Sequence, residues 1–150
     1  MKARAKLIEG MTFLGEAGSG HGLVMDGAPE YGGRNLGFRP MELLLVGLAG
    51  CTAFDVVLIL RKGREVVADC VVEVSAERAA EDPKVFTRIH LSYRVAGHGL
   101  TEAKVKRAIE LSKEKYCSAS IMLGATAALT HEFTIEPASD GAGSAPAGKP

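Results

Sequence analysis

The fold is decided by residues 40–60, which read Pro40 followed by MELLLVGLAGCTAFDVVLIL. The run is about as long as a membrane span requires. It contains Glu42 and Asp55, however, and ionisable groups are rare and costly in lipid. We therefore expect a helix buried inside protein and no membrane span. Pro40 suits the first turn, where its missing N–H has no partner, and the cations and glycine of residues 61–63 suit the end of a helix.

Strands are predicted on both sides of this helix, because apolar and polar residues alternate there. They fall at residues 1–8, 11–14, 23–25, 66–77, 85–95 and 129–135. Residues 28–39 show no periodicity and predict a long loop. A second, amphipathic helix should run from an N-cap at Thr101 to about Tyr116, with a short helix near 121–125. The order predicts an α+β fold, in which an antiparallel sheet packs against a long buried central helix and the amphipathic helix.

The length of 150 residues predicts one domain, residues 1–137. Residues 138–150 have no large apolar side chain and predict a disordered, low-complexity tail. Lys and Arg total 18 and so do Asp and Glu, a balance that disfavours a nucleic-acid-binding protein. One sheet covers mainly one side of a helix that is apolar all round. We therefore expect a symmetric homodimer that covers the other side.

Three cysteines are candidates for chemistry, and no secretory signal opens the chain, so we expect reduced thiols in the cytoplasm. Cys51 lies midway along the central helix, either packing as a small apolar residue or acting as a reactive thiol. Asp55 lies on the same helix face, at the i,i+4 position. A buried carboxylate needs a partner, and an arginine there would also favour the thiolate of Cys51.

Cys117 leaves the second predicted helix just before the short one. The amides of that helix start, with Lys113 and Lys115, are expected to lower the pKa of Cys117, unless it is only a buried loop thiol. Cys70 faces inward on its strand and predicts core packing. His131 predicts a hydrogen-bonded core histidine. A zinc site of Cys51, Cys117 and His131 lacks the usual short ligand spacing, so we expect no metal and no cofactor.

Four motifs together resemble the OsmC/Ohr family, in particular its YhfA-like branch. They are Pro40-Met41-Glu42-Leu43, Gly50-Cys51, Asp55-Val56-Val57 and Glu114-Lys115-Tyr116-Cys117-Ser118. The resemblance covers about residues 1–136. It implies an intertwined homodimer with two long central helices between two sheets, in agreement with the burial argument, which does not use it.

The resemblance also implies an enzyme, an antioxidant thiol peroxidase of the stress response that reduces organic or lipid hydroperoxides. Cys51 matches the peroxidatic cysteine and Cys117 the resolving one. The implied cycle forms a sulfenic acid on Cys51, which condenses with Cys117 to a disulfide. A dithiol, lipoyl-linked in the studied members, would reduce the pair again.

Family peroxidases hold the thiolate with an arginine and a glutamate. Here Met41 stands at the expected glutamate position, and the early turn at residues 9–11 has no arginine. The residues left to support the thiolate are Arg4, Arg34, Arg39, Asp55 and Glu42. The alternative function is a non-peroxidase that binds a small apolar or thiol-reactive ligand in a pocket at the dimer interface.

Overall fold

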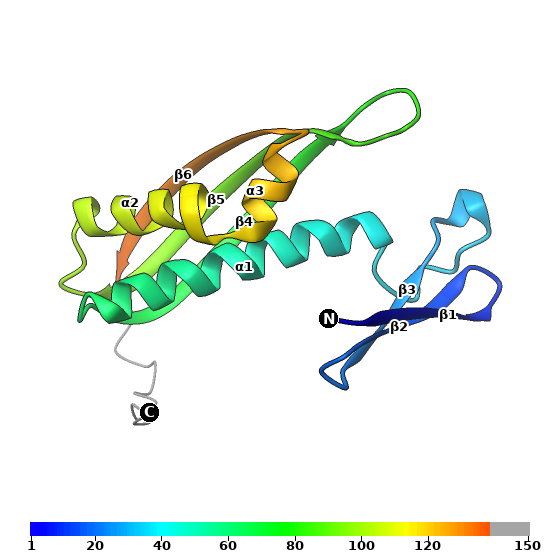
Figure 1. Cartoon of the computed structure of the whole chain (residues 1–150), viewed down its shortest axis with the longest axis horizontal. Coiled ribbons are helices and arrows are strands. Elements are labelled where there is room, and N and C mark those ends of the chain that lie inside the picture. Colours follow the sequence, from blue (N-terminus) through cyan, green and yellow to red (C-terminus); the bar gives the residue numbers. More distant parts are fainter. Residues whose placement is uncertain (139–150) are drawn as a thin grey trace. The chain divides into compact units, whose positions relative to one another are not determined.

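The computed structural model describes residues 1–138, which form two compact units (Figure 1). The first unit is Met1–Val46, and the second begins at Gly47. The boundary falls inside helix α1 (Pro40–Lys62), the helix predicted from its apolar run. Of the tail predicted for residues 138–150, residues 139–150 lie outside the described part of the chain.

The first unit is a three-stranded antiparallel sheet followed by a long loop. Its strands pair in the order β1 (Ala3–Glu9), β2 (Thr12–Ala17) and β3 (Gly22–Asp26). Gly10 turns the chain between β1 and β2 with a φ of 56°, where glycine is favoured. The loop contains one 3₁₀ turn, η1 (Pro29–Tyr31). The buried Asp26 carboxylate ties the loop to the sheet by accepting N–H bonds from Arg34 and Leu36.

Helix α1 buries one stripe of side chains. The buried positions recur every fourth residue and are Leu48, Thr52, Val56 and Leu60. Other apolar side chains of the helix are open, and Phe54 is 69% exposed. The helix predicted to be buried on all sides is thus covered on one side by its own chain. Its length and composition would also fit a membrane span, but the core helix of a soluble protein passes the same test.

The second unit contains another three-stranded sheet, in the order β4 (Val66–Arg78), β5 (Phe86–His98) and β6 (Ala128–Pro137). β4 and β5 are antiparallel, as predicted. β6 departs from the predicted antiparallel sheet, because it pairs parallel with β5. The helical segment between β5 and β6 is a crossover connection, which returns the chain to the end of the sheet where β5 begins.

This crossover consists of α2 (Glu102–Leu111), a π-helical turn η2 (Ser112–Tyr116) and α3 (Ser118–Gly124). The sequence predicted one regular helix as far as about Tyr116, whereas the α-helix ends at Leu111. The amide of Cys117 donates to the carbonyl of Ser112, five residues back, which is the bond of a π-turn. The predicted inward stripe is confirmed, since its members are all buried: Val105, Ala108, Ile109 and Ser112.

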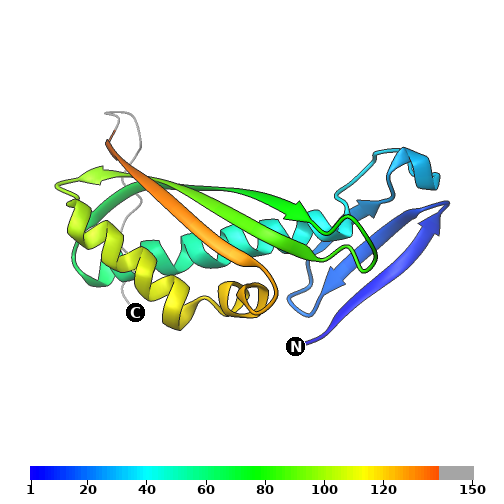
Figure 2. The same ribbon diagram turned by 90° about the horizontal axis from the view of Figure 1, so that it is seen from above.

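Helices α1 and α2 cover the same face of the β4–β6 sheet (Figure 2). The β5 side chains on that face are buried: Ile89, Leu91, Tyr93 and Val95. Val85 was predicted to face inward but is 43% exposed, and Phe86 takes the buried position instead. The reason is a β-bulge near Arg78, which shifts the pairing of β4 and β5 at that end of the sheet.

Candidate functional site

Cys51, Asp55 and Cys117 come together in the second unit. The two sulfur atoms and one carboxylate oxygen of Asp55 all lie within 4.8 Å of one another. Cys51 and Asp55 share one face of α1 because they are four residues apart. Cys117 reaches them from the junction between η2 and α3. Both cysteines are free thiols, so the fold places two reduced sulfurs as neighbours.

The backbone on both sides of Cys117 holds its thiol in place. Its amide donates to the Ser112 carbonyl (2.8 Å), and its Sγ accepts from the Ser120 amide (3.4 Å). Burial raises the pKa of Cys117, and the neighbouring Cys51 adds to this, against the lowering effect of the hydrogen bonds from Ser120. The expectation of a lowered pKa was therefore wrong, because the side chain is fully buried. Lys115 lies instead over the ring of Tyr116, 5.4 Å from its centre.

A chain of hydrogen bonds runs from this cluster into the core. Ser112 Oγ donates to Asp55 Oδ2 (3.2 Å) and is 2.9 Å from Thr52 Oγ1, which in turn is 2.8 Å from the hydroxyl of Tyr93. Burial raises the pKa of Tyr93 to about 12, so its phenol stays protonated at neutral pH. The chain joins α1 to η2 and β5 and gives Asp55 a hydroxyl donor, where an arginine was expected.

The hydroxyl residues Thr52, Tyr93 and Ser112 were not predicted from the sequence to be part of the site. A signal was nevertheless present, because Thr52 interrupts an apolar helix and Ser112 falls on the inward stripe of the second helix. Buried polar groups are almost always hydrogen-bonded, so Thr52 and Ser112 each implied a hydrogen-bond partner that the sequence does not identify. Only the fold shows that they are partners of each other.

Two of the predicted supporting arginines form ion pairs within the first unit. Arg4 on β1 pairs with Glu16 on β2 through both Nε and Nη2. Arg34 in the long loop pairs with Glu9, with Nη2 2.9 Å from Oε2. All four side chains are well exposed, so each pair contributes little to stability. A role of either arginine at Cys51 stays a prediction.

Arg39 and Glu42, also in the first unit, hold the loop at the start of α1. Arg39 Nη2 donates to Asn35 Oδ1 (2.9 Å), and its Nη1 donates to the carbonyls of Asp26 and Gly37. The Glu42 carboxylate accepts from the amide of Arg39 (2.9 Å), which satisfies a free donor before the first turn of the helix. Their predicted support of the thiolate is likewise untested.

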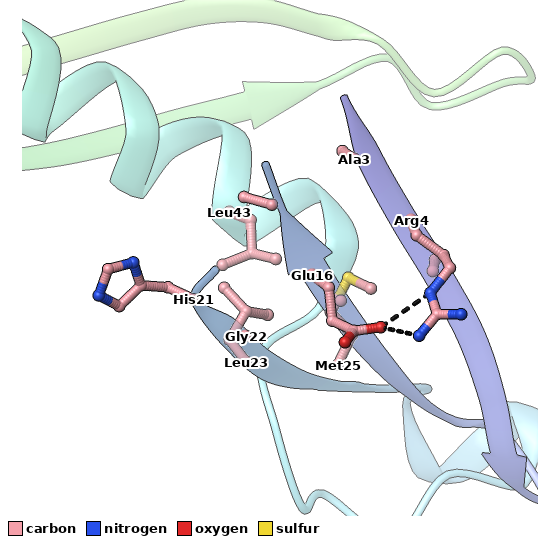
Figure 3. Close-up of a pocket in the computed structure, with 11 residues that line it drawn as sticks. Ala3, Arg4, Glu16, His21, Gly22, Leu23, Met25 and Leu43 are labelled. Carbon is pink, nitrogen blue, oxygen red and sulfur yellow. Dashed lines mark hydrogen bonds and ion pairs between the residues drawn. The ribbon is translucent and has the colours of Figure 1, made fainter. Parts of the chain in front are cut away.

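The first unit also contains an apolar hollow of about 470 Å³ beside β1, β2 and β3 (Figure 3). Its apolar lining includes Ala3, Ala5, Leu23, Met25 and Leu43. The hydrogen-bonded pair of Arg4 and Glu16 lies at one edge, and His21 lies at another. The hollow is of the size that binds small molecules.

His131 and Cys70 lie outside the cysteine–aspartate cluster. His131 is half-buried, and burial lowers its pKa. Among residues 1–138 its ring has no hydrogen-bond partner within the protein, unlike the hydrogen-bonded core histidine expected, and its nitrogens are open to solvent. Cys70 is half-buried on β4, and burial, with the charge of Asp69, raises its pKa to about 11. Such a thiol is unreactive at neutral pH, in keeping with the packing role predicted for it.

Comparison with known proteins finds relatives both by sequence and by structure. The chain is 46% identical to Protein YhfA of Escherichia coli strain K12 over 138 residues, which is 90% of this chain and 98% of that protein. The crystal structure of a hypothetical protein from Aquifex aeolicus VF5 is similar with a TM-score of 0.80 and 29% identity, covering 92% of this chain and 97% of that one.

More distant structures share the fold. The organic hydroperoxide resistance protein OhrB of Bacillus subtilis aligns with a TM-score of 0.62 at 17% identity, over 89% of this chain and 96% of that one. The sequence model of the OsmC-like protein family matches residues 32–132, a range that includes Cys51, Asp55 and Cys117. On these matches, and with the α+β architecture they share, the chain belongs to the OsmC-like protein family.

Proposed function

We propose that this protein is a thiol-dependent peroxidase that reduces organic hydroperoxides with Cys51 and Cys117. The observation that carries the proposal is the neighbouring pair of free sulfurs, held within 4.8 Å by two separate elements. Relatives of the same fold include proteins described as organic hydroperoxide resistance proteins, which supports the same chemistry.

The different exposure of the two cysteines supports the roles proposed for them. Cys51 is half-buried, whereas Cys117 is fully buried, so a hydroperoxide reaches the sulfur of Cys51 first. The Cys51 thiolate attacks the outer peroxide oxygen, the O–O bond breaks, and the alkoxide takes a proton and leaves as an alcohol. Cys51 is then a sulfenic acid.

The second step uses the neighbouring thiol. Cys117 attacks the sulfenic sulfur, a disulfide forms, and the hydroxyl leaves as water with the proton of the Cys117 thiol. An external dithiol then reduces the disulfide by exchange and becomes oxidised itself. This cycle fits the cytoplasm, where thiols are kept reduced, and we expect the protein to act there.

The homodimer is part of the proposal. Its support is the open apolar side of α1, where Phe54 is 69% exposed and Leu58 is 39% exposed. Apolar helix surface of this kind is normally covered in a soluble protein. A second copy would cover it and would bring its own first unit, whose Arg4, Arg34 and Arg39 would be the source of the cation that favours the thiolate of Cys51.

The test is oxidation of the purified, reduced chain with one equivalent of cumene hydroperoxide. We expect the three free thiols to fall to one, with loss of two hydrogens by mass spectrometry and formation of one equivalent of alcohol. In Cys117→Ser the reaction should stop at a sulfenic acid on Cys51, which dimedone traps. Cys51→Ser should consume peroxide far more slowly than wild type. Cys70→Ser is the matched control and should behave as wild type.

A wild-type chain whose Cys51 reacts with cumene hydroperoxide no faster than free cysteine would refute the peroxidase. The apolar hollow of the first unit then supports the second candidate, a non-peroxidase that binds a small apolar or thiol-reactive ligand, although the pocket expected for it was at the dimer interface. Ligand binding in the hollow should raise the melting temperature. Leu23→Lys, which places a charge in the hollow, should abolish that rise, whereas Tyr31→Lys, at a 70% exposed residue outside it, should not.

A further inference from the structure

We propose that the reduced protein binds a thiophilic divalent metal ion, of the zinc class, through Cys51, Asp55 and Cys117. The proposal starts from geometry, because one donor atom of each residue lies within 4.8 Å of the other two. Two sulfurs bound to one tetrahedral zinc ion are about 3.8 Å apart, given Zn–S bonds of about 2.3 Å. The two sulfurs therefore have to approach each other by about one ångström at most.

The donor set selects the class of metal. Two cysteine sulfurs favour zinc and its soft relatives over magnesium and calcium, which prefer oxygen ligands. One carboxylate oxygen as the third ligand is compatible with zinc. Cys51 and Asp55 are only half-buried, so a fourth position can hold water on that side. Three protein ligands with an open position are typical of accessible zinc sites, unlike closed structural ones.

The surroundings already orient two of the three ligands. Ser112 Oγ donates to one oxygen of Asp55, Oδ2 (3.2 Å), and the Ser120 amide donates to Cys117 Sγ (3.4 Å). Hydrogen bonds of this kind fix the direction of metal ligands and strengthen binding. Ser112 is itself held by Thr52, whose hydroxyl is 2.9 Å away in the core. The ligands are thus placed before any ion arrives.

Charge limits the ligand of this cluster to a cation. With both thiols deprotonated, the three side chains carry three negative charges. In the described part of the second unit, the hydrogen bonds that these side chains accept come from Ser112 and Ser120, whose donors are uncharged. A divalent cation would neutralise most of that charge, and its binding would release the two thiol protons to the buffer.

The test is a titration of the full, reduced chain with Zn²⁺ under anaerobic conditions, in competition with a coloured chelator. We expect one ion per chain. Cys117→Ser and Asp55→Asn should each weaken the affinity by at least about 10-fold, because each removes a ligand and loss of a group that only hydrogen-bonds a ligand already costs about 10–100-fold. Cys70→Ser removes a thiol outside the cluster and should leave the affinity unchanged. Circular dichroism of each variant checks that it is folded.

A spectroscopic measurement on the wild-type chain keeps the test independent of variants. Co²⁺ in place of Zn²⁺ should give the intense near-ultraviolet band of thiolate-to-cobalt charge transfer and the visible bands of a tetrahedral ion. The proposal is overturned if these bands do not appear, or if Cys70→Ser weakens binding as much as Cys117→Ser does. No peroxide is used, so the outcome does not depend on the proposed peroxidase.

Discussion

Thr52→Val tests the hydrogen-bond chain that supports the candidate site. Thr52 is fully buried, and its hydroxyl contacts both the Tyr93 hydroxyl and Ser112 Oγ. Valine has nearly the same shape, so the substitution removes the hydroxyl with little change in packing. Tyr93, which is 3% exposed, loses the hydrogen bond to Thr52, whereas Ser112 keeps its bond to Asp55.

The magnitude follows from the groups left without a partner. A buried polar group that loses its hydrogen bond costs about 1–3 kcal/mol, so we expect Thr52→Val to lower the free energy of unfolding by about 2 kcal/mol. Tyr93→Phe removes the phenol hydroxyl and leaves Thr52 bonded to Ser112, so it should lower the free energy of unfolding by about 1 kcal/mol. In the double variant the hydroxyl of residue 93 is absent, so no buried hydroxyl is left unpaired there. Its cost should therefore be about 1 kcal/mol less than the sum of the two single costs.

The assay is urea unfolding at one fixed protein concentration, because dimer formation would make stability depend on concentration. Thr101→Val is the matched control, since Thr101 is exposed and its side chain makes no capping bond to α2. It should change stability by less than about 0.5 kcal/mol. Strictly additive costs for Thr52→Val and Tyr93→Phe, or a Thr52→Val cost as small as that of the control, would refute the hydrogen-bond chain.

Three further predictions concern other parts of the chain. Hydrogen bonds to Asp26, above all from the Leu36 amide, lower its pKa below 3.8. The contribution of its carboxylate to stability is therefore present above pH 3.8 and lost as the pH falls through the folded-state pKa. The free energies of unfolding of wild type and Asp26→Asn should converge in acid, and a constant difference between them would contradict this. In a variant without the other two cysteines, Cys70 should react with iodoacetamide at pH 8 far more slowly than free cysteine does, and the rate of alkylation should rise only towards pH 11. Fast alkylation at pH 8 would show that the thiol is not buried as described. Gly33→Ala should destabilise the first unit by more than about 1 kcal/mol in thermal unfolding, because the added Cβ would lie 1.8 Å from the carbonyl oxygen of Gly27, and an unchanged melting temperature would rule out that close approach.

Most secondary structure was predictable from local patterns. The long helix begins at Pro40 as its sequence indicates, and the alternating segments became strands. The departures have non-local or cooperative causes. The parallel pairing of β6, the bulge that buries Phe86 in place of Val85 and the π-turn at Ser112 all depend on how elements meet in space. Local periodicity reports which face of an element is apolar, and it does not report its partner.

The site divides in the same way. Sequence alone placed Cys51 and Asp55 on one face of an apolar helix, because helical spacing is a local property. It also marked Cys117 as the second sulfur. Only the tertiary structure brought Cys117 beside them and raised its pKa by burial, and only packing joined Thr52 to Tyr93 and Ser112. Burial and distance between remote residues are set by the packed chain as a whole, so no local pattern can encode them.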